Sequence, residues 1–507
     1  MEFNFLEEIL GFEKRNPDSI ALVIGEDQYS YHHIISSAKS LSFFLKKHVK
    51  KNIPCILLSE KTHFFYELIL ACFLSKLIYT PININGSLDR NKKIIQSIDN
   101  AVILIGDIDY EKIKPFIPSF SKKKIFVLNQ NLLKFFKKNN RVRYIALDTT
   151  SSKKITFPSE KDIAYLLFTS GSTGSPKGVP ISYKNINAYL ASVWILFPCD
   201  TNDHFSQISD IGFDISIHEI LFCWSVGATL HVYDSNFFSS IVDFIGNSGI
   251  TQLIVIPSMI DQIVKLSRYF KINFKMLKKT IVCGEPFPIT YAKSWEKIAP
   301  NSTIINFYGP TEATVSCIYH CYNAKNDYSG LTTVPIGYPF PGVGIALTNQ
   351  SEMVVSGEQV SSGYLFSDSK KNEKFQLSAD KKINRYFTGD TAFFHKKYGF
   401  VFKERRDDQW QIRGYRIEKS EVENTLKLVT GFDDICVVPQ CNSEKLIDYL
   451  CLFSLENFRL KDYEKELRSY LIPAAIPEKH FVIDAFPRFT NGKINYNRLL
   501  TTGRNCT

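Results

Sequence analysis

The sequence predicts an α/β protein with a large layered N-terminal domain, made of two α/β subdomains and a small β subdomain, followed by a small mobile α+β C-terminal domain. Three observations predict it. Strand-like apolar runs alternate with segments of helical period as far as Pro335, short strands and turns follow, and a densely charged stretch at 404–414 precedes a compact final unit. Since charged linkers often separate domains, we predict a core domain at 1–405 and a lid domain at 406–507.

The first 150 residues show the alternation of a layered α/β domain. A strand pair is predicted around Ile20 to Tyr31, and a helix follows at Ile34 to Lys47, where apolar residues recur at helical spacing. The segment Leu68 to Ile84 is typical of a buried helix followed by a strand. Further strands are expected at Ala101 to Ile105 and Ile125 to Leu128.

Composition limits the class of protein. The chain has 507 residues, of which 44% are hydrophobic and 22% charged, and this is ordinary for a soluble enzyme of two or more domains. The N-terminal MEFNFLEEIL is acidic where a secretory signal is basic, and no apolar run reaches membrane-spanning length, so we expect a cytoplasmic protein. The eleven cysteines form no CxxC pair and are expected to be reduced thiols.

The net charge of +10 raises the question of nucleic-acid binding, helped by lysines at 122–124, 137 and 138. No nucleic-acid-binding module accompanies them, so a solvated lysine-rich face is favoured and no nucleic-acid partner is expected. Tight, salt-sensitive binding to DNA or RNA would indicate the opposite. A basic surface is also suited to docking an acidic protein.

The most informative stretch is 165–179, YLLFTSGSTGSPKGV. A predicted strand, Ile163 to Phe168, ends in a loop that is typical of phosphate binding, since glycines free the backbone N–H groups and hydroxyls and a lysine add donors. It is not the G-x-x-x-x-G-K-[ST] loop, and the alternative is a flexible linker. A linker is disfavoured because the loop lies between a buried strand and the helix N-cap Ser182. The candidate phosphate-binding residues are Thr169, Ser170, Gly171, Ser172, Thr173, Gly174 and Lys177.

Three later strands also end in polar or glycine-containing loops. Gln252 to Ile256 ends at Pro257, before a helix predicted from Ile260; Lys279 to Cys283 ends at 284–286; and Ser302 to Phe307 ends at 308–312. In open α/β sheets ligands bind outside the carboxyl ends of the strands. We therefore expect these loops to converge with the phosphate loop in one site.

The final unit is predicted to contain a helix capped by Ser420, with Glu423 completing a capping box. Strands at Ile435 to Val438, Leu446 to Phe453 and His480 to Phe486, a helix at Lys461 to Tyr470 and the loop RFTNGK at 488–493 complete it. Its size suits an independent lid.

In order along nearly the whole chain, the motifs FTSGSTGSPKGV, FDIS, NFYGPTEATV, YFTGD, DDQWQIRGYRIEKSEVE and NGKINYNRLL resemble those of the adenylate-forming superfamily. That family comprises acyl-CoA and aryl-CoA ligases, luciferases and the adenylation domains of nonribosomal peptide synthetases. The sequence is most similar to stand-alone amino-acid adenylation domains such as D-alanine carrier-protein ligases.

The resemblance implies roles for individual residues, with ATP and Mg²⁺ as cofactors. Thr169 to Lys177 would hold the β and γ phosphates, Glu312 would bind the metal, and Lys493 would be the catalytic lysine of the terminal loop. Asp407 would be the hinge. Tyr308 would stack on adenine, an interaction worth ~1–3 kcal/mol. Catalytic roles are implied for Lys493, Glu312 and Thr169, and ATP contacts for Gly284, Glu285, Pro286, Asn306, Phe307, Tyr308, Gly309 and Thr311, with Asp390 and Arg405 on the ribose.

The chemistry explains these residue types. A carboxylate attacks the α-phosphate of ATP, and cations must screen the repulsion between the two anions. No general base is needed, because a carboxylate is already ionised at neutral pH. Closure of the lid would bring Lys493 to the site for adenylation, and a second orientation, turned about Asp407, would admit a thiol past Arg413 and Gly414. Two residues depart from the family pattern. Glu404 stands where the hinge motif has Gly, and Gln411 stands where Lys is frequent, so hinge motion and the thiolation contacts are expected to differ.

The resemblance also indicates the substrate. Asp214 stands where amino-acid-activating members carry the carboxylate that pairs with the substrate ammonium, so an amino acid is favoured. Phe307 stands where Ala or Gly is common, which predicts a small substrate; alanine is a suggestion, and His218 is either a specificity residue or a hydrogen-bonded wall residue. The predicted substrate-binding residues are Asp214, Ile215, His218, Met259, Ile281, Cys283, Phe307, Val315 and Ser316.

The chain stops fourteen residues after Lys493, with no carrier module, so we expect a separate phosphopantetheinylated carrier protein whose acidic helices suit the basic surface. The first alternative is a coenzyme A ligase for a small or aromatic acid, in which Asp214 would be incidental. The second is a degenerate binding protein, which the presence of Lys177, Glu312, Asp390, Arg405 and Lys493 disfavours.

Overall fold

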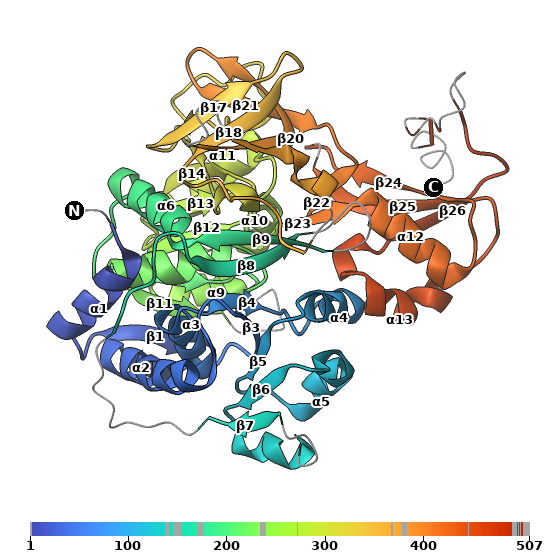
Figure 1. Ribbon diagram of the computed structural model, residues 1–507. Helices are drawn as coiled ribbons and strands as arrows, with labels where there is room; N and C mark the ends of the chain where they lie inside the picture. The colour runs from blue at the N-terminus through green and yellow to red at the C-terminus, as the bar shows by residue number, and fades with distance from the viewer. Residues whose placement is uncertain are drawn as a thin grey trace.

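The computed structural model describes residues 3–136, 141–145, 155–169, 176–233, 240–270, 272–366, 369–377, 383–444, 446–488, 494, 496 and 498–499. Figure 1 shows a large body that carries the N-terminus and a smaller unit that holds the last strands and helices, joined through the strands β22 and β23. This is the predicted layered α/β fold with a small β subdomain and an α+β C-terminal unit.

One α/β layer of the large body is a seven-stranded sheet. Its inner strands are continuous apolar runs, and all five residues of Pro54–Leu58 are buried, as expected for parallel strands covered on both faces. The predicted strands at 101–105 and 125–128 are confirmed. The order is β7 (Val142–Tyr144), β6 (Lys124–Val127), β5 (Val102–Ile105), β3 (Pro54–Leu58), β4 (Ile78–Pro81), β8 (Ile163–Thr169) and β9 (Lys177–Ser182).

The second layer is a nine-stranded sheet. The N-terminal hairpin forms one of its edges and pairs there with a strand from a distant part of the chain. The predicted strand pair is confirmed at 20–30, and β1 lies parallel to β11, about two hundred residues further along the chain. Its order is β16 (Tyr338–Pro339), β15 (Ile318–Cys321), β14 (Thr303–Tyr308), β13 (Lys279–Val282), β12 (Gln252–Val255), β10 (His204–Gln207), β11 (Thr229–Val232), β1 (Ile20–Ile24) and β2 (Asp27–Ser30).

Helices cover both sheets, and local signals set several of their ends. The predicted cap Ser182 accepts the amide of Asn185, whose side chain accepts the Ser182 amide in return. The helix predicted from Ile260 begins at Pro257, since proline is tolerated in a first turn. The helices are α1 (Phe5–Arg15), α2 (Tyr31–His48), α3 (His63–Ser75), α4 (Leu88–Ser97), α5 (Tyr110–Ile113), α6 (Tyr183–Leu196), α7 (Ile215–Ile217), α8 (Cys223–Ser225), α9 (Ser240–Asn247), α10 (Pro257–Phe270) and α11 (Ile289–Ile298).

Short helical turns connect several of these elements. One of them, η3, is a π-helical segment that links α7 to α8. The turns are η1 (Lys114–Phe120), η2 (Gln130–Phe136), η3 (His218–Phe222), η4 (Thr311–Ala313), η5 (Ser369–Lys374) and η6 (Pro473–Ala475).

The predicted small β subdomain is present and starts after Pro339, slightly later than the expected boundary at Pro335. It is a five-stranded antiparallel sheet in which Asp390 and Arg405 are register partners on adjacent strands. Its strands are β17 (Val343–Leu347), β18 (Glu352–Gly357), β19 (Phe375–Leu377), β20 (Asn384–His395) and β21 (Gly399–Arg405).

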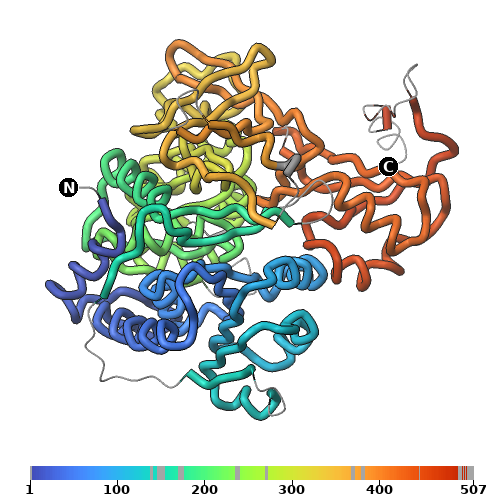
Figure 2. Tube along the Cα trace, in the orientation of Figure 1, coloured from blue at the N-terminus to red at the C-terminus, as the bar shows by residue number. Residues whose placement is uncertain are grey.

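The C-terminal unit has hydrophobic clusters of its own, formed by residues from 410 onward. Figure 2 shows this part of the chain as a separate lobe at the red end of the trace, and α13 lies beside α4 of the large body, where the Ser87 hydroxyl donates to the Tyr470 carbonyl. Its elements are β22 (Gln409–Ile412), β23 (Tyr415–Glu418), α12 (Lys419–Thr430), β24 (Ile435–Cys441), β25 (Ile447–Ser454), α13 (Leu460–Tyr470) and β26 (Lys479–Val482).

The predicted capping box at Ser420 is wrong. Helix α12 follows β23 without a break, its N-cap is Glu418, and Ser420 is already in the first turn. Glu423 instead accepts the backbone N–H of Val437 at 2.9 Å and therefore ties the helix to β24. The strand predicted at 480–486 is also shorter, ending at Val482.

Gly337 allows the nine-stranded sheet to meet the β subdomain, because its N–H and C=O both pair with Phe400 at 2.9 and 2.7 Å. Its φ is +91°, and a Cβ would lie 2.0 Å from the Tyr319 carbonyl oxygen. We predict that Gly337→Ala destabilises the fold by about 3 kcal/mol, through strain and a backbone clash. Gly330→Ala is the matched control, since its φ is +83° with no atom within 4 Å, and should cost about 1–2 kcal/mol. Denaturant unfolding followed by circular dichroism measures both, and equal losses would contradict the clash.

Candidate active site

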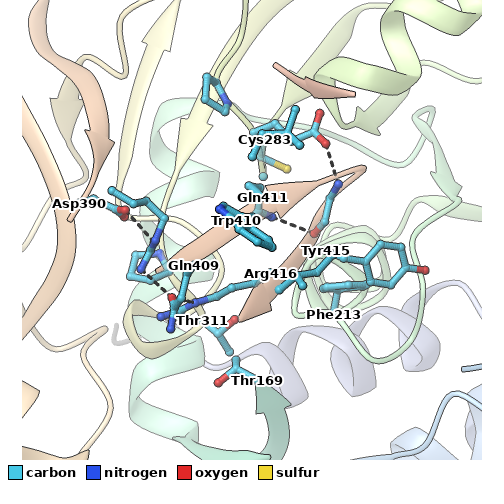
Figure 3. Close-up of a pocket in the computed structure, with 18 of the residues that line it drawn as sticks. Thr169, Phe213, Cys283, Thr311, Asp390, Gln409, Trp410, Gln411, Tyr415 and Arg416 are labelled. Atoms are coloured by element: carbon cyan, nitrogen blue, oxygen red, sulfur yellow. Dashed lines mark hydrogen bonds and ion pairs between the residues drawn. The ribbon is translucent and has the colours of Figure 1, made fainter. Parts of the chain in front are cut away.

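A cavity of about 710 Å³ lies between the large body and the C-terminal unit. Figure 3 shows its residues converging from several elements, with the β22–β23 hairpin passing through the middle. The end of β8 and the loops after β13 and β14 line the cavity, so two of the four loops expected to converge do so, while residues 170–175 of the glycine-rich loop lie outside the described residues. The loop after β12 contributes indirectly, because the amide of Ser258 donates to the Glu285 carboxylate at 2.9 Å.

The glycine-rich loop connects two antiparallel strands, β8 and β9, and its ends Thr169 and Lys177 are register partners. Thr169 lines the cavity. Lys177 is buried, and its ammonium lies 3.7 Å from Glu418 at the end of β23. Burial lowers the pKa of Lys177, although the Glu418 carboxylate opposes this. The predicted phosphate ligands Ser170, Gly171, Ser172, Thr173 and Gly174 lie outside the described residues.

The loop after β13 presents Gly284, Glu285 and Pro286 to the cavity, as expected. Gly284 has a φ of +86°, a conformation that disfavours any side chain. Besides the Ser258 amide, the Glu285 carboxylate accepts the backbone N–H of Gly414 at 2.7 Å. Burial raises the pKa of Glu285. A residue predicted to border adenine therefore holds the tip of the hairpin.

The strand β14 and the loop after it supply the predicted residues Asn306, Phe307, Tyr308, Gly309 and Thr311, all of which line the cavity. Gly309 must be a glycine, since a Cβ there would lie 2.4 Å from the Cα of Ser316. The amide side chain of Asn306 donates to the carbonyls of Val334 and Pro335 at 3.1 and 2.9 Å, which fixes the strand end against the following segment.

A hydrogen-bonded chain connects Tyr308 to the predicted hinge. The Tyr308 hydroxyl donates to Asp390 at 2.6 Å, and the other Asp390 oxygen accepts from Arg405 at 2.7 Å. Arg405 also donates to both oxygens of Asp407, at 2.9 and 3.0 Å. Burial raises the pKa of Asp390 despite Arg405, whereas the Arg405 guanidinium outweighs the effect of burial on Asp407 and lowers its pKa. The two residues predicted on the ribose thus orient each other.

Glu312, the predicted metal ligand, is fully buried. Its carboxylate accepts the Tyr364 hydroxyl at 2.5 Å, and the Arg416 guanidinium lies 3.4 Å from both of its oxygens. Burial alone would raise the pKa of Glu312, but Arg416 and Tyr364 outweigh it and the pKa is lowered. An ionised, buried carboxylate supplies the oxygen ligands that Mg²⁺ prefers, so Glu312 could hold the metal ion.

Asp214 lies just before α7 and lines the cavity. The Thr311 hydroxyl and the Val315 amide interact with its carboxylate, but Oδ2 finds no hydrogen-bond partner among the described residues. Burial raises the pKa of Asp214 to about 6. A buried carboxylate oxygen without a hydrogen-bond partner is costly unless a ligand completes its interactions.

The other predicted substrate residues divide into two groups. Ile215, Cys283, Phe307 and Val315 line the cavity with Asp214. The second group does not line the cavity: His218, Met259, Ile281 and Ser316.

His218 is 1% exposed and shares a 2.6 Å hydrogen bond with the Tyr189 hydroxyl. Burial lowers its pKa to about 3, so the ring is neutral. These contacts fit the wall-residue alternative more directly than a substrate contact, although Nε2 has no partner within the described part of the chain.

The sequence placed the hairpin at the thiol entrance and did not reveal that its side chains line the cavity. Gln409 accepts from Arg405 at 2.8 Å and from Arg416 at 2.6 Å, and the Tyr415 ring meets Phe213 edge-on at 5.1 Å. The sequence feature that could have indicated this hairpin is the pair Arg413 and Gly414 between two short strands. Both residues have positive φ, as a type I′ hairpin turn requires.

Lys493, the predicted catalytic lysine, lies outside the described residues. None of the described helices combines the length and the apolar character that a bilayer span needs.

The family described as AMP-binding enzyme matches residues 12–365 of this chain. A D-alanine–D-alanyl carrier protein ligase from Staphylococcus aureus (strain Newman) is 27% identical over 508 residues, covering 98% of each chain. The Vibrio cholerae adenylation domain AlmE, solved with glycyl-adenosine-5'-phosphate, has a TM-score of 0.84 at 22% identity, over 100% of this chain and 98% of that one.

NpsA-ThdA, an artificially fused adenylation–PCP di-domain from Klebsiella oxytoca, has a TM-score of 0.80 at 21% identity, over 95% of this chain and 94% of that one. At these identities the solved structures show a shared fold. Because the family match spans more than half of the chain and the fold agrees, the chain belongs to the AMP-binding enzymes and is an adenylate-forming ligase.

Proposed function

We propose that this ligase uses ATP to convert a small α-amino acid to aminoacyl-AMP and pyrophosphate, and then transfers the aminoacyl group to the phosphopantetheine thiol of a separate carrier protein. The observation that carries the proposal is Asp214: a buried carboxylate that lines the cavity and has an unpartnered oxygen among the described residues. A substrate ammonium supplies the cation and the hydrogen-bond donors that this carboxylate lacks.

The shape of the cavity wall supports a small side chain. Phe307 lies 5.6 Å from the Phe197 ring and 5.2 Å from the Phe340 ring, so it is packed in place rather than free to swing aside. Cys283 and Val315 complete this side of the lining. The relatives agree with a small substrate, since one acts on D-alanine and another was solved with a glycyl adenylate.

In the adenylation step, a carboxylate oxygen of the amino acid forms a bond to the α-phosphorus, and the bond to the bridging oxygen of pyrophosphate breaks. We assign Lys177 and the glycine-rich loop to the leaving phosphates, and Tyr308, Asp390 and Arg405 to the nucleoside. Glu312 would hold Mg²⁺, which screens the phosphate charge when bound. Lys493 would approach both reactants from the C-terminal lid.

The transfer step would use the arrangement described above, with the β22–β23 hairpin in the cavity. Here Arg416 contacts Glu312, and Gly414 contacts Glu285. We propose that residues 406–507 turn as a lid about Asp407, which in this orientation is held by Arg405 and by Lys374 at 3.3 Å. The carrier thiol then attacks the acyl carbon and AMP leaves. The carrier-protein ligase among the relatives and the adenylation–PCP structure support such a partner.

The experiment that tests the proposal is substrate-dependent ATP/pyrophosphate exchange with Mg²⁺ and a panel of small L- and D-amino acids, beside the same acids lacking the amino group. We expect exchange with one or a few small amino acids. Asp214→Asn should lower kcat/KM for the amino acid by roughly 100-fold or more, since a buried ion pair loses one partner. The KM for ATP is the internal control, and Asp214→Asn should leave it nearly unchanged because Asp214 is assigned to the amino acid. Exchange only with the acids lacking the amino group would favour a coenzyme A ligase instead.

The raised pKa of Asp214 predicts a pH dependence. The carboxyl group is protonated below about pH 6 in the substrate-free site and then cannot pair with an ammonium. The KM for the amino acid should therefore rise as the pH falls through about 6, while the KM for ATP changes much less. Steady-state exchange between pH 5 and 8 measures both constants. A flat KM for the amino acid would contradict the role of Asp214.

The two half-reactions should separate by mutation. Lys493→Ala is expected to lower exchange roughly 100-fold or more, as for loss of a donor to developing charge. Arg416→Gln should keep exchange within several-fold and slow carrier loading, because Arg416 contacts Glu312 in the hairpin-inserted arrangement. Arg468→Gln, which removes an exposed arginine on α13, is the control. Equal losses of both half-reactions in Arg416→Gln would contradict the separation.

A further inference from the structure

A second cluster of potential metal ligands lies in the first α/β layer, where α2 and α3 run side by side (Figures 1 and 2). It consists of His33 in the first turn of α2, His63 at the start of α3, and Glu67 one turn further along α3. One ligand atom from each lies within 4.8 Å of the others. None of the three lines the cavity described above.

The geometry of the cluster suits a metal. Nε2 of His33 lies 3.3 Å from Oε1 of Glu67, and Nδ1 of His63 lies 2.8 Å from the same oxygen. With metal–ligand bonds of about 2.0–2.1 Å, tetrahedral ligands are separated by about 3.3 Å, so small side-chain adjustments would admit an ion. Two imidazoles and one carboxylate are a donor set that Zn²⁺ and related ions prefer.

The surroundings hold the ligands in place. The side chain of Glu67 is 1% exposed, and its second oxygen accepts the Ser37 hydroxyl. The amide of His33 donates to the N-cap Ser30 at 3.1 Å, and the ring of His63 stacks on Tyr29 at 4.6 Å. Ordered ligands supported by a second layer of contacts lower the entropy lost when a metal binds.

The cluster is also accessible. The His33 side chain is 50% exposed, whereas that of Glu67 is buried beneath it. An ion would therefore bind at the surface end of the α2–α3 interface and keep an open position for water. We propose that His33, His63 and Glu67 form a binding site for a divalent transition-metal ion that links α2 to α3, separate from the magnesium site of the ligase reaction.

The test is a titration of the full chain with Zn²⁺ against a chromophoric chelator, followed by X-ray absorption at the zinc edge. We expect one saturable site with a nitrogen and oxygen shell at about 2.0–2.1 Å. His33→Ala should weaken binding at least 10-fold, and Ser37→Ala, which removes a contact to the ligand carboxylate, about 10-fold. His32→Ala is the matched control, because this neighbouring histidine pairs with Glu13 and is 63% exposed.

Folding and competing sites are controlled in the same experiment. Since its side chain is half exposed, His33→Ala should keep the wild-type circular dichroism and metal-free unfolding midpoint, so that loss of binding is not loss of fold. Zn²⁺ should raise the midpoint of the wild type and of His32→Ala but not of His33→Ala. A sulfur shell at about 2.3 Å would assign the ion to exposed thiols such as Cys321. That result, the absence of saturable binding, or unchanged binding in His33→Ala would overturn the proposal.

Discussion

The parallel pairing of β12, β13 and β14 is the constraint on which the site depends. Because the three strands run in one direction and in adjacent register, their carboxyl ends meet at one edge of the sheet. The loops that follow β13 and β14 then face the cavity, and Ser258, in the first turn of α10 after β12, supports the loop after β13 through Glu285. Polar groups that are separated along the chain by tens of residues become neighbours in this way, as in other open α/β sheets.

The β22–β23 hairpin uses the same side chains that the proposed adenylation step needs. Lys177 faces Glu418, Glu285 holds Gly414, and Glu312 faces Arg416. A nucleotide with its metal and the inserted hairpin therefore compete for these groups under the proposed function. Lys177 and Glu312 each face an opposite charge in the hairpin-inserted arrangement, which avoids the cost of two uncompensated buried charges.

Buried carboxylates distinguish the two proposed ligand sites from the ordinary core. Asp214 has an oxygen without a partner among the described residues, and the electrostatic cost of its burial appears as a raised pKa. Glu67 instead receives two imidazoles and a hydroxyl, so its oxygens are occupied. Under the proposed function, the ammonium group of the substrate would complete the interactions of Asp214, whereas at the proposed metal site an ion would share the groups that already contact Glu67.

Local patterns in the sequence were sufficient for the main alternation of strands and helices and for the cap at Ser182, and the ordered family motifs were sufficient for several of the cavity-lining residues. These depend on periodicity, turn residues and ordered motifs, which act over short distances along the chain. The capping box at Ser420 failed because the pairing of β23 with β22 runs directly into α12 and outweighs a local capping signal. Only the tertiary structure decided that the N-terminal hairpin joins β11, that Arg416 meets Glu312, that His218 bonds to Tyr189, and that His33 and His63 share Glu67. Each of these depends on packing between segments far apart in sequence, and local residue preferences carry no information about such contacts.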